Sequence, residues 1–362
     1  MSATNPKAET PLYPFIAKLL RGEDLTAPEA ANFYRTLTDM RHGSIQMAAA
    51  ITALTAKGET AAELAGMASV MREQALRLSS VPKNAVDITG TGSSSAKTFN
   101  VSTAAAFVAA GAGLTVAKQS NRAVTSSTGS ADVLGELGVK VAGEPELAET
   151  SLNGVGLCFL FAPKFHPTLR RVGDVRRKLG IRTCLNLLGV MANPARVSKL
   201  LIGVWHESLV TPVANALAML KTERAWVVYG SDGLDEITIT GPTHVMEVIG
   251  NKTRTFTLSP KDFGFKVGSA DALRIKTAKE SAKVIREVLS SQRRDEARSL
   301  VVMNAAAALV IGGVAKDPLH AARLAEQAID SGQAQNKLER LIQATNKKSR
   351  PVICTSPSML DN

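Results

Sequence analysis

The chain has 362 residues, of which 45% are hydrophobic and 21% charged, which is typical of a soluble globular protein rather than a disordered chain. Its formal net charge of +11 indicates an anionic partner, either a phosphorylated small molecule or a nucleic acid. Aromatic residues make up only 4% and do not interleave with basic runs, which argues against stacking platforms for single-stranded nucleic acid.

The opening segment and the cysteines indicate the cellular compartment of the protein. The opening MSATNPKAETPLYP is polar, and the uncharged, Ala-rich run at residues 299–315 is too short for a bilayer span. Three scattered cysteines form neither a disulfide framework nor a zinc site. We therefore expect a cytoplasmic protein that has no membrane partner.

Helical signals fill residues 11–80. Thr26 precedes the segment APEAANFYRTL, and Thr60 with Glu63 forms a capping box before LAGMASVMREQAL. Between them, an Ala-rich segment starts at Ser44 and stops at Gly58. These signals predict a small N-terminal helical domain, residues 1–82, without catalytic residues of its own.

From residue 85 onward, short apolar strands alternate with helices. The strands are expected at residues 85–89, 114–118, 157–161 and 224–230. Alternation of this kind predicts an α/β fold with a mostly parallel central sheet covered by helices on both faces. Ligands of such sheets bind beyond the carboxyl ends of the strands.

The C-terminal part continues this second domain, which is predicted to cover residues 83–346. Segments 236–240 (EITIT) and 253–259 (TRTFTLS) alternate with period two and are expected to add antiparallel strands. Residues 270–346 are expected to be helical. The aperiodic tail, residues 347–362, is expected to be disordered.

The stretch DITGTGSSSAKTFN, residues 87–100, has the composition of a phosphate loop. Lys97 and Thr98 match the end of a nucleotide P-loop, but Thr91 and Ala96 stand where that motif needs glycine. The spacing therefore argues against a nucleotide P-loop.

A more general anion site remains at this position. The segment reads as a buried strand, a turn at Gly90–Gly92 and a helix N-terminus, whose unpaired N–H groups attract anions. An ordinary strand-to-helix connection capped by Asn100 or Ser102 is an equally good interpretation of the local pattern.

Two further polar stretches fall at the same edge of the predicted sheet. KQSNRAVTSSTGS follows the second strand, and DGLDE follows the strand at 224–230. The adjacent acids Asp235 and Glu236 could hold Mg²⁺, which takes one or two carboxylates together with substrate phosphates. A turn whose acids merely face water explains the same residues.

Taken together, these motifs resemble the anthranilate phosphoribosyltransferase family, which has the nucleoside phosphorylase type II fold. The resemblance covers about residues 12–346 and rests on GTG, FNVSTAAAFVAAGAGLTVAK, NRAVTSSTGSADVLGELG, FLFAPKFHPTLRRVGDVRRKLGIRT, NLLG, NPA and DGLDEITITGPT in order. It implies a homodimer, with helices near 166–198 packing on the helical domain. It also implies Mg²⁺-dependent transfer of the phosphoribosyl group from phosphoribosyl pyrophosphate (PRPP) to anthranilate in tryptophan biosynthesis.

The resemblance also implies roles for individual residues. The residues implied to bind PRPP are Gly90, Thr91, Gly92, Ser93, Ser94, Thr98, Asn100, Val101, Ser102, Thr103, Lys118 and Ser130. Those implied to bind the acceptor are Gly90, Gln119, Asn121, Arg176 and Val190. The implied metal ligands are Ser102, Asp235 and Glu236, and none of the residues is implied to act as a general acid or base.

Three departures from the family pattern fall near substrate. The loop glycines and acid of the family are replaced by Ser93–Ser95, a His-Gly pair by Gln119 and Ser120, and a proline by Val190. These changes leave open a different aromatic acceptor. They also leave open a non-enzymatic relative that binds nucleic acid in a basic cleft, for which steep salt dependence would be diagnostic.

Overall fold

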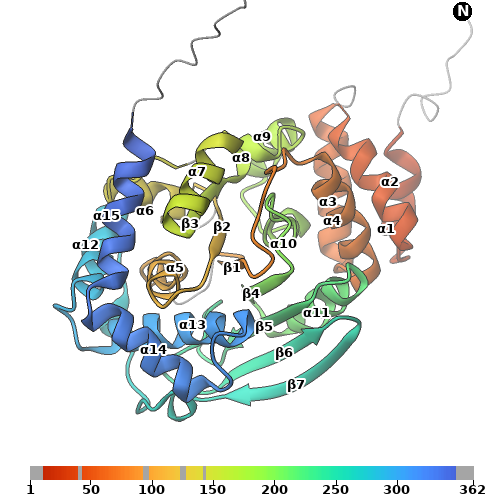
Figure 1. The fold of residues 1–362 in the computed structure, drawn as a ribbon. Coiled ribbons are helices and arrows are strands. Elements are labelled where there is room, and N and C mark those ends of the chain that lie inside the picture. Colours follow the sequence, from red (N-terminus) through yellow and green to blue (C-terminus); the bar gives the residue numbers. More distant parts are fainter. Residues whose placement is uncertain (1–10, 40–42, 93–97, 123–127, 142–143, 348–362) are drawn as a thin grey trace, which may run out of the picture.

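Figure 1 shows the computed structural model, which describes residues 11–39, 43–92, 98–122, 128–141 and 144–347. The N-terminal bundle consists of α1 (Tyr13–Leu20), α2 (Ala27–Thr38), α3 (Ser44–Lys57) and α4 (Ala61–Gln74). The expected capping boxes are present, because Thr26 and Thr60 accept the N–H groups of Glu29 and Glu63 at the starts of α2 and α4. Local capping therefore fixes where these two helices begin.

A seven-stranded sheet forms the second part, in the order β3-β2-β1-β4-β5-β6-β7. Five strands are parallel: β1 (Val86–Gly90), β2 (Val116–Ser120), β3 (Leu157–Phe161), β4 (Lys199–Gly203) and β5 (Arg224–Gly230). The last two, β6 (Thr243–Ile249) and β7 (Lys252–Leu258), are antiparallel. The register pairs Gly90 with Gly203 and Gly203 with Val228, so β1, β4 and β5 present their carboxyl ends side by side.

Helices cover both faces of the sheet (Figure 1). Side chains of β1 and β2 pack on one face in a core that includes α5 (Val101–Gly111), α12 (Ala278–Leu289), α13 (Glu296–Gly312), α14 (Pro318–Asp330) and α15 (Gln333–Asn346). Two further helices, α6 (Ser130–Glu136) and α7 (Pro145–Val155), lie toward the β3 edge. The mostly parallel α/β architecture predicted from the alternating pattern is confirmed.

The opposite face carries the helical bundle. There α8 (Ala162–Phe165), α9 (Leu169–Leu179), α10 (Cys184–Met191) and α11 (Val210–Met219) join α2–α4 in a second core with the strands. Within this core, α9 contacts α2 and α3, and α10 contacts α3 and α4. No helix among the described ranges is both long and apolar enough to cross a bilayer.

One strand prediction needs correction, and one strand was not anticipated. Residues 236–240 are not a strand; the antiparallel neighbour of β5 is β6, which begins at Thr243. Ile237 and Ile239 are buried as the alternation implied, but the backbone N–H and C=O of Ile237 bond to the side chain of Asn304 instead of a strand. In addition, β4 was not predicted from the sequence.

Candidate active site

The Gly90–Gly92 turn leaves the end of β1 and meets the acidic loop that follows β5. The N–H of Gly92 donates to Asp235 Oδ2 at 2.7 Å, and the N–H of Thr91 donates to the Gly203 carbonyl at 2.9 Å. A Cβ on Gly90 would lie 2.5 Å from Asp235 Oδ2, so only glycine lets the carboxylate come this close. The turn thus already holds an anionic group with its backbone, as an anion site requires.

Asp235 and Glu236 lie at the N-terminus of α5, where the backbone of Ser102 donates to Glu236. Burial and repulsion from Asp235 raise the pKa of Glu236 to about 8, while Lys118 and a backbone hydrogen bond from Ser102 oppose the rise. The three implied metal ligands therefore lie together. Two adjacent carboxylates, one of which accepts a hydrogen bond from the backbone of Ser102, provide oxygen donors that suit a hard cation such as Mg²⁺.

Lys118 lies beneath this acidic pair. Its side chain is buried and its Nζ donates to the Ile88 carbonyl. Burial lowers the pKa of Lys118, whereas Asp87, Glu236 and Asp235 act to raise it. The lysine thus places a positive charge close to the carboxylates, and in this conformation it is buried rather than exposed to solvent.

Asp87, on β1, is the third carboxylate near Lys118. Burial raises the pKa of Asp87 to about 6, against the effect of Lys118 and of hydrogen bonds. Its oxygens accept from Asn193 Nδ2 at 2.7 Å and from the N–H of Gln119 at 3.2 Å. The NPA motif contains Asn193, but the sequence does not indicate that this residue pairs with Asp87.

Asn100 joins three segments at the start of α5. Its Oδ1 accepts from Thr128 Oγ1 and from Ser281 Oγ, both at 2.9 Å, and its N–H donates to Ser281 Oγ at 3.0 Å. Within the residues described, its side chain does not cap α5. The simple capping interpretation of Asn100 is therefore not the observed arrangement.

The neighbours of Asn100 differ in exposure. Val101 and Thr103 are fully buried, and their N–H groups bond to the carbonyls of Phe99 and Asn100. Ser102, between them, is only partly buried. Of these three side chains, that of Ser102 is therefore the best placed to meet a ligand at the sheet edge.

The segment after β2 turns back onto α6. The N–H of Asn121 donates to Ser130 Oγ at 3.1 Å, so these two implied site residues lie together. Gln119 is 8% exposed, and its Oε1 has no hydrogen-bond partner in the described part of the chain. A buried amide oxygen without a partner is an available acceptor for a donor group on a ligand.

The acceptor residues on the bundle side come from two helices. Arg176 on α9 is half-buried, burial lowers its pKa, and its Nε is without a partner among the described residues. Val190 is buried in α10. Ser93 and Ser94 lie outside the described residues.

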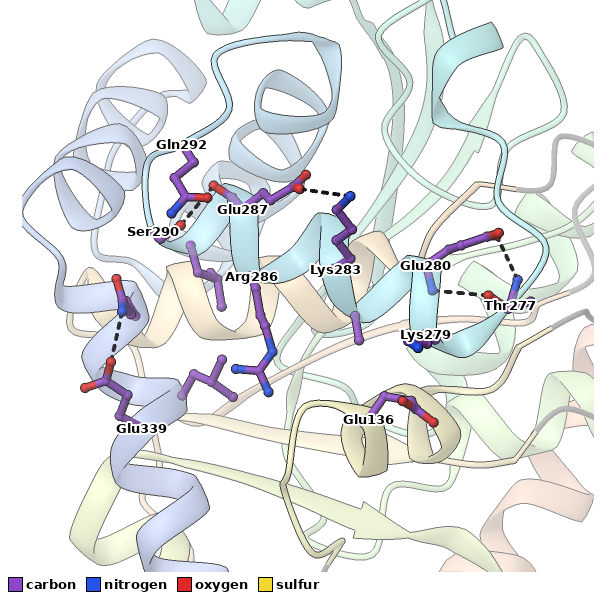
Figure 2. Close-up of a pocket in the computed structure, with 14 residues that line it drawn as sticks. Glu136, Thr277, Lys279, Glu280, Lys283, Arg286, Glu287, Ser290, Gln292 and Glu339 are labelled. Atoms are coloured by element: carbon purple, nitrogen blue, oxygen red, sulfur yellow. Dashed lines mark hydrogen bonds and ion pairs between the residues drawn. The ribbon is translucent and has the colours of Figure 1, made fainter.

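Two cavities lie beside these elements. One, of about 340 Å³, is bordered by Thr98, Asp232 and Arg274, and Thr98 pairs with Arg274 as an isolated bridge. A larger one, of about 800 Å³, lies between α6, α12 and α15 and is lined by side chains of both charges (Figure 2). None of the implied active-site residues that the structure describes borders the larger cavity, so the larger volume does not identify the active site.

Gly203 is a site residue that the sequence did not indicate. The backbone of Asp235 crosses directly over it, and a Cβ at this position would lie only 3.0 Å from Asp235 Cα and nearer still to the Asp235 carbonyl. This close approach fixes the height of the acidic loop above the sheet. In the sequence, Gly203 simply follows the apolar residues Leu200–Ile202, and this pattern does not indicate contact with a distant loop.

Family models match both parts of the chain. A model described as the helical bundle domain of a glycosyl transferase family matches residues 13–75, and one described as its a/b domain matches residues 82–335. Together they cover most of the sequence in the order in which the bundle and the sheet occur.

Relatives of known name cover nearly the whole chain. The anthranilate phosphoribosyltransferases of Chloroflexus aggregans and Rhodospirillum rubrum are 45% and 42% identical, over 90% and 94% of this chain and 96% and 97% of their own. The enzyme of Thermus thermophilus, 35% identical, superposes with a TM-score of 0.85 over 91% of this chain and 98% of its own. The Saccharomyces cerevisiae enzyme in complex with PRPP and Mg is 26% identical. It superposes with a TM-score of 0.83 over 94% of this chain and 98% of its own. This chain therefore belongs to the anthranilate phosphoribosyltransferase family.

Proposed function

We propose that this protein transfers the phosphoribosyl group of PRPP to the amine of anthranilate, releases pyrophosphate and so serves tryptophan biosynthesis. The observation that carries the proposal is the meeting of the Gly90–Gly92 turn, Ser102 and the Asp235–Glu236 pair at one sheet edge. Relatives of this name at 45% identity support the reaction, and a yeast relative in complex with PRPP and Mg supports the donor and metal.

On the donor side, the chain offers backbone donors, carboxylates and a lysine. The Gly92 N–H points at an oxygen of Asp235 and could instead meet an oxygen of pyrophosphate. Asp235, Glu236 and the Ser102 hydroxyl would hold Mg²⁺, which when bound neutralises negative charge on the departing pyrophosphate. Lys118 places a further positive charge beneath the same carboxylates.

On the acceptor side, anthranilate presents a carboxylate and an amine on neighbouring ring carbons. The half-buried Arg176 is suited to the carboxylate, because a guanidinium with an unpartnered donor forms charge-assisted hydrogen bonds. Gln119 Oε1 is suited to the amine because it has no other partner among the described residues, whereas Asn121 Oδ1 already accepts from the N–H of Arg122. Holding the amine opposite the breaking C1′–O bond converts the reaction into an attack by a positioned nucleophile.

The test is fluorescence-monitored consumption of anthranilate in the presence of PRPP and Mg²⁺, with calorimetric titration of PRPP alongside. Asp235→Asn combined with Glu236→Gln should abolish turnover and weaken PRPP binding in Mg²⁺. A control that removes two exposed carboxylates, Glu144→Gln with Glu146→Gln, should leave turnover unchanged. PRPP binding without anthranilate consumption would point to another acceptor, and salt-sensitive binding of nucleic acid instead of PRPP would reject the proposal.

We further propose a homodimer that uses the outer face of the bundle. Tyr13 and Leu20 on α1, Ile45 on α3 and Ile181 after α9 are 42%, 73%, 84% and 42% exposed. Because α1 and α9 both pack on α3, these apolar side chains lie on adjoining elements. Light scattering after gel filtration should give twice the chain mass, and Ile45→Glu should reduce it to one chain mass.

A further inference from the structure

Asn304 is a buried polar residue in a long and largely buried helix. It lies in α13, where the following residues Ala305–Leu309 are all apolar and buried. Its side chain is 0% exposed. Burying an amide among alanines is unfavourable unless the amide makes its hydrogen bonds, so the identity of its partners indicates its role.

The side chain of Asn304 satisfies both backbone groups of Ile237. Its Oδ1 accepts the N–H of Ile237 at 2.9 Å, and its Nδ2 donates to the carbonyl of Ile237 at 2.9 Å. The same Nδ2 donates to the Leu300 carbonyl within α13 at 2.9 Å. The amide therefore pairs with the backbone N–H and C=O of Ile237, as the backbone of a neighbouring β-strand would.

That single residue follows Glu236 directly. Beyond Ile237, the loop is held separately, because Thr238 N–H donates to Thr243 Oγ1 at 3.0 Å and Thr238 Oγ1 donates to Asp232 Oδ2 at 2.6 Å. On the other side of the acids, the loop crosses closely over Gly203. The peptide plane that follows Glu236 is thus oriented by Asn304.

We infer that Asn304 is a positioning residue, which sets the direction of the Asp235 and Glu236 carboxylates by clamping the peptide next to them. The inference rests on the proposed function only for the role of these carboxylates as metal ligands, and not on the identity of the acceptor. Two fixed hydrogen bonds to one residue restrict its φ and ψ, and therefore restrict the carboxylates attached just before it.

The test uses the full-length protein and two readouts other than turnover. Asn304→Leu keeps nearly the same shape but removes both hydrogen bonds to Ile237, and Asn304→Ala is a second variant in case the first does not fold. Val302→Ala is the matched control, because Val302 is equally buried in α13 but lies about 200° around the helix from Asn304. Each variant is compared by hydrogen exchange of the peptide spanning 232–240 and by Mn²⁺ titration in the presence of PRPP.

We expect both Asn304 variants to accelerate exchange of the 232–240 peptide at least tenfold and to raise the Kd for Mn²⁺ at least tenfold, while Val302→Ala changes neither by more than twofold. Unchanged exchange would overturn the clamp. Faster exchange with an unchanged Mn²⁺ Kd would overturn the positioning role and leave Asn304 as a packing residue. Absence of anthranilate turnover in the wild type, with Mn²⁺ and PRPP still bound, would reject the proposed acceptor and leave this inference testable.

Discussion

Gly203→Ala should inactivate the enzyme without unfolding it. The added Cβ would lie 3.0 Å from Asp235 Cα and closer to the Asp235 carbonyl, so restoring the 3.4 Å of ordinary contact moves the acidic loop by about 1 Å or more. The strand itself cannot yield easily, because Gly203 is paired with Gly90 on one side and Val228 on the other. The displacement therefore falls on the carboxylates.

A displacement of about 1 Å at a positioned catalytic group costs roughly 10²-fold in rate, or about 2.7 kcal/mol of transition-state stabilisation. We expect kcat/KM for anthranilate, measured by loss of its fluorescence, to fall by at least that factor. The apparent affinity for Mg²⁺ should fall with it, because the carboxylates move away from Ser102.

Gly154→Ala provides the control for this substitution. Gly154 lies within α7, has a negative φ and has nothing within 4 Å of a built Cβ, so alanine there should be neutral or add about 0.5 kcal/mol of stability. Circular dichroism and thermal melts show whether both variants fold. A folded Gly203→Ala protein that keeps kcat/KM within threefold of wild type would refute the reasoning that the loop height is set at this glycine.

Three further predictions concern Ser281, Arg176 and His166. Ser281→Ala removes two hydrogen bonds from Asn100 and should raise KM for PRPP about tenfold. The control Ser290→Ala, at the end of α12, should leave this KM unchanged. The same KM for PRPP in both variants would contradict the prediction. Arg176→Gln should raise KM for anthranilate about 10²-fold with little change for PRPP, and an effect on PRPP instead would reject the assignment. Burial lowers the pKa of His166 to about 4, below its ordinary 6.5, so the unfolded chain binds the proton more readily. Stability should therefore fall by about 3 kcal/mol as the pH drops from 6.5 to 4, and His166→Gln should flatten this dependence in denaturant titrations.

Elements governed by local chemistry were predictable from the sequence. The capping boxes of Thr26 and Thr60 located two helix starts, because the partners lie only three residues away. The strands at Leu157–Phe161 and Arg224–Gly230 were predicted with the observed bounds, since each is a short, largely apolar run that follows a glycine or a charged residue. The sheet edge that gathers the ligand loops followed from the parallel arrangement.

Elements governed by distant partners were not predictable. The apolar part of β4 before its glycine is only Leu200–Ile202, against the whole of Leu157–Phe161 in β3, and so short a run does not separate strand from helix. The alternation at Ile237 and Ile239 correctly indicated burial, but its hydrogen-bond partner is Asn304, far along the chain. An amphipathic pattern reports which side chains are buried and does not report which group satisfies the backbone.

The same limit applies to the site. The residues that touch substrate in the proposed reaction came from motifs, whereas those that set their positions did not. Gly203, Asn193 and Asn304 act through close approach or hydrogen bonds to segments remote in sequence. One sequence contains no measure of such distances, so the supporting residues emerged only with the fold.

The apolar core on the bundle side has a consequence for folding. That core is continuous: α2, α3 and α4 share it with strand residues such as Ala117, Leu160 and Ile202. Cooperative unfolding units follow shared buried surface more closely than sequence boundaries. A fragment ending near residue 82 would expose the face that now meets the sheet and its helices, and would be prone to aggregate, so the bundle and the sheet should melt in one transition.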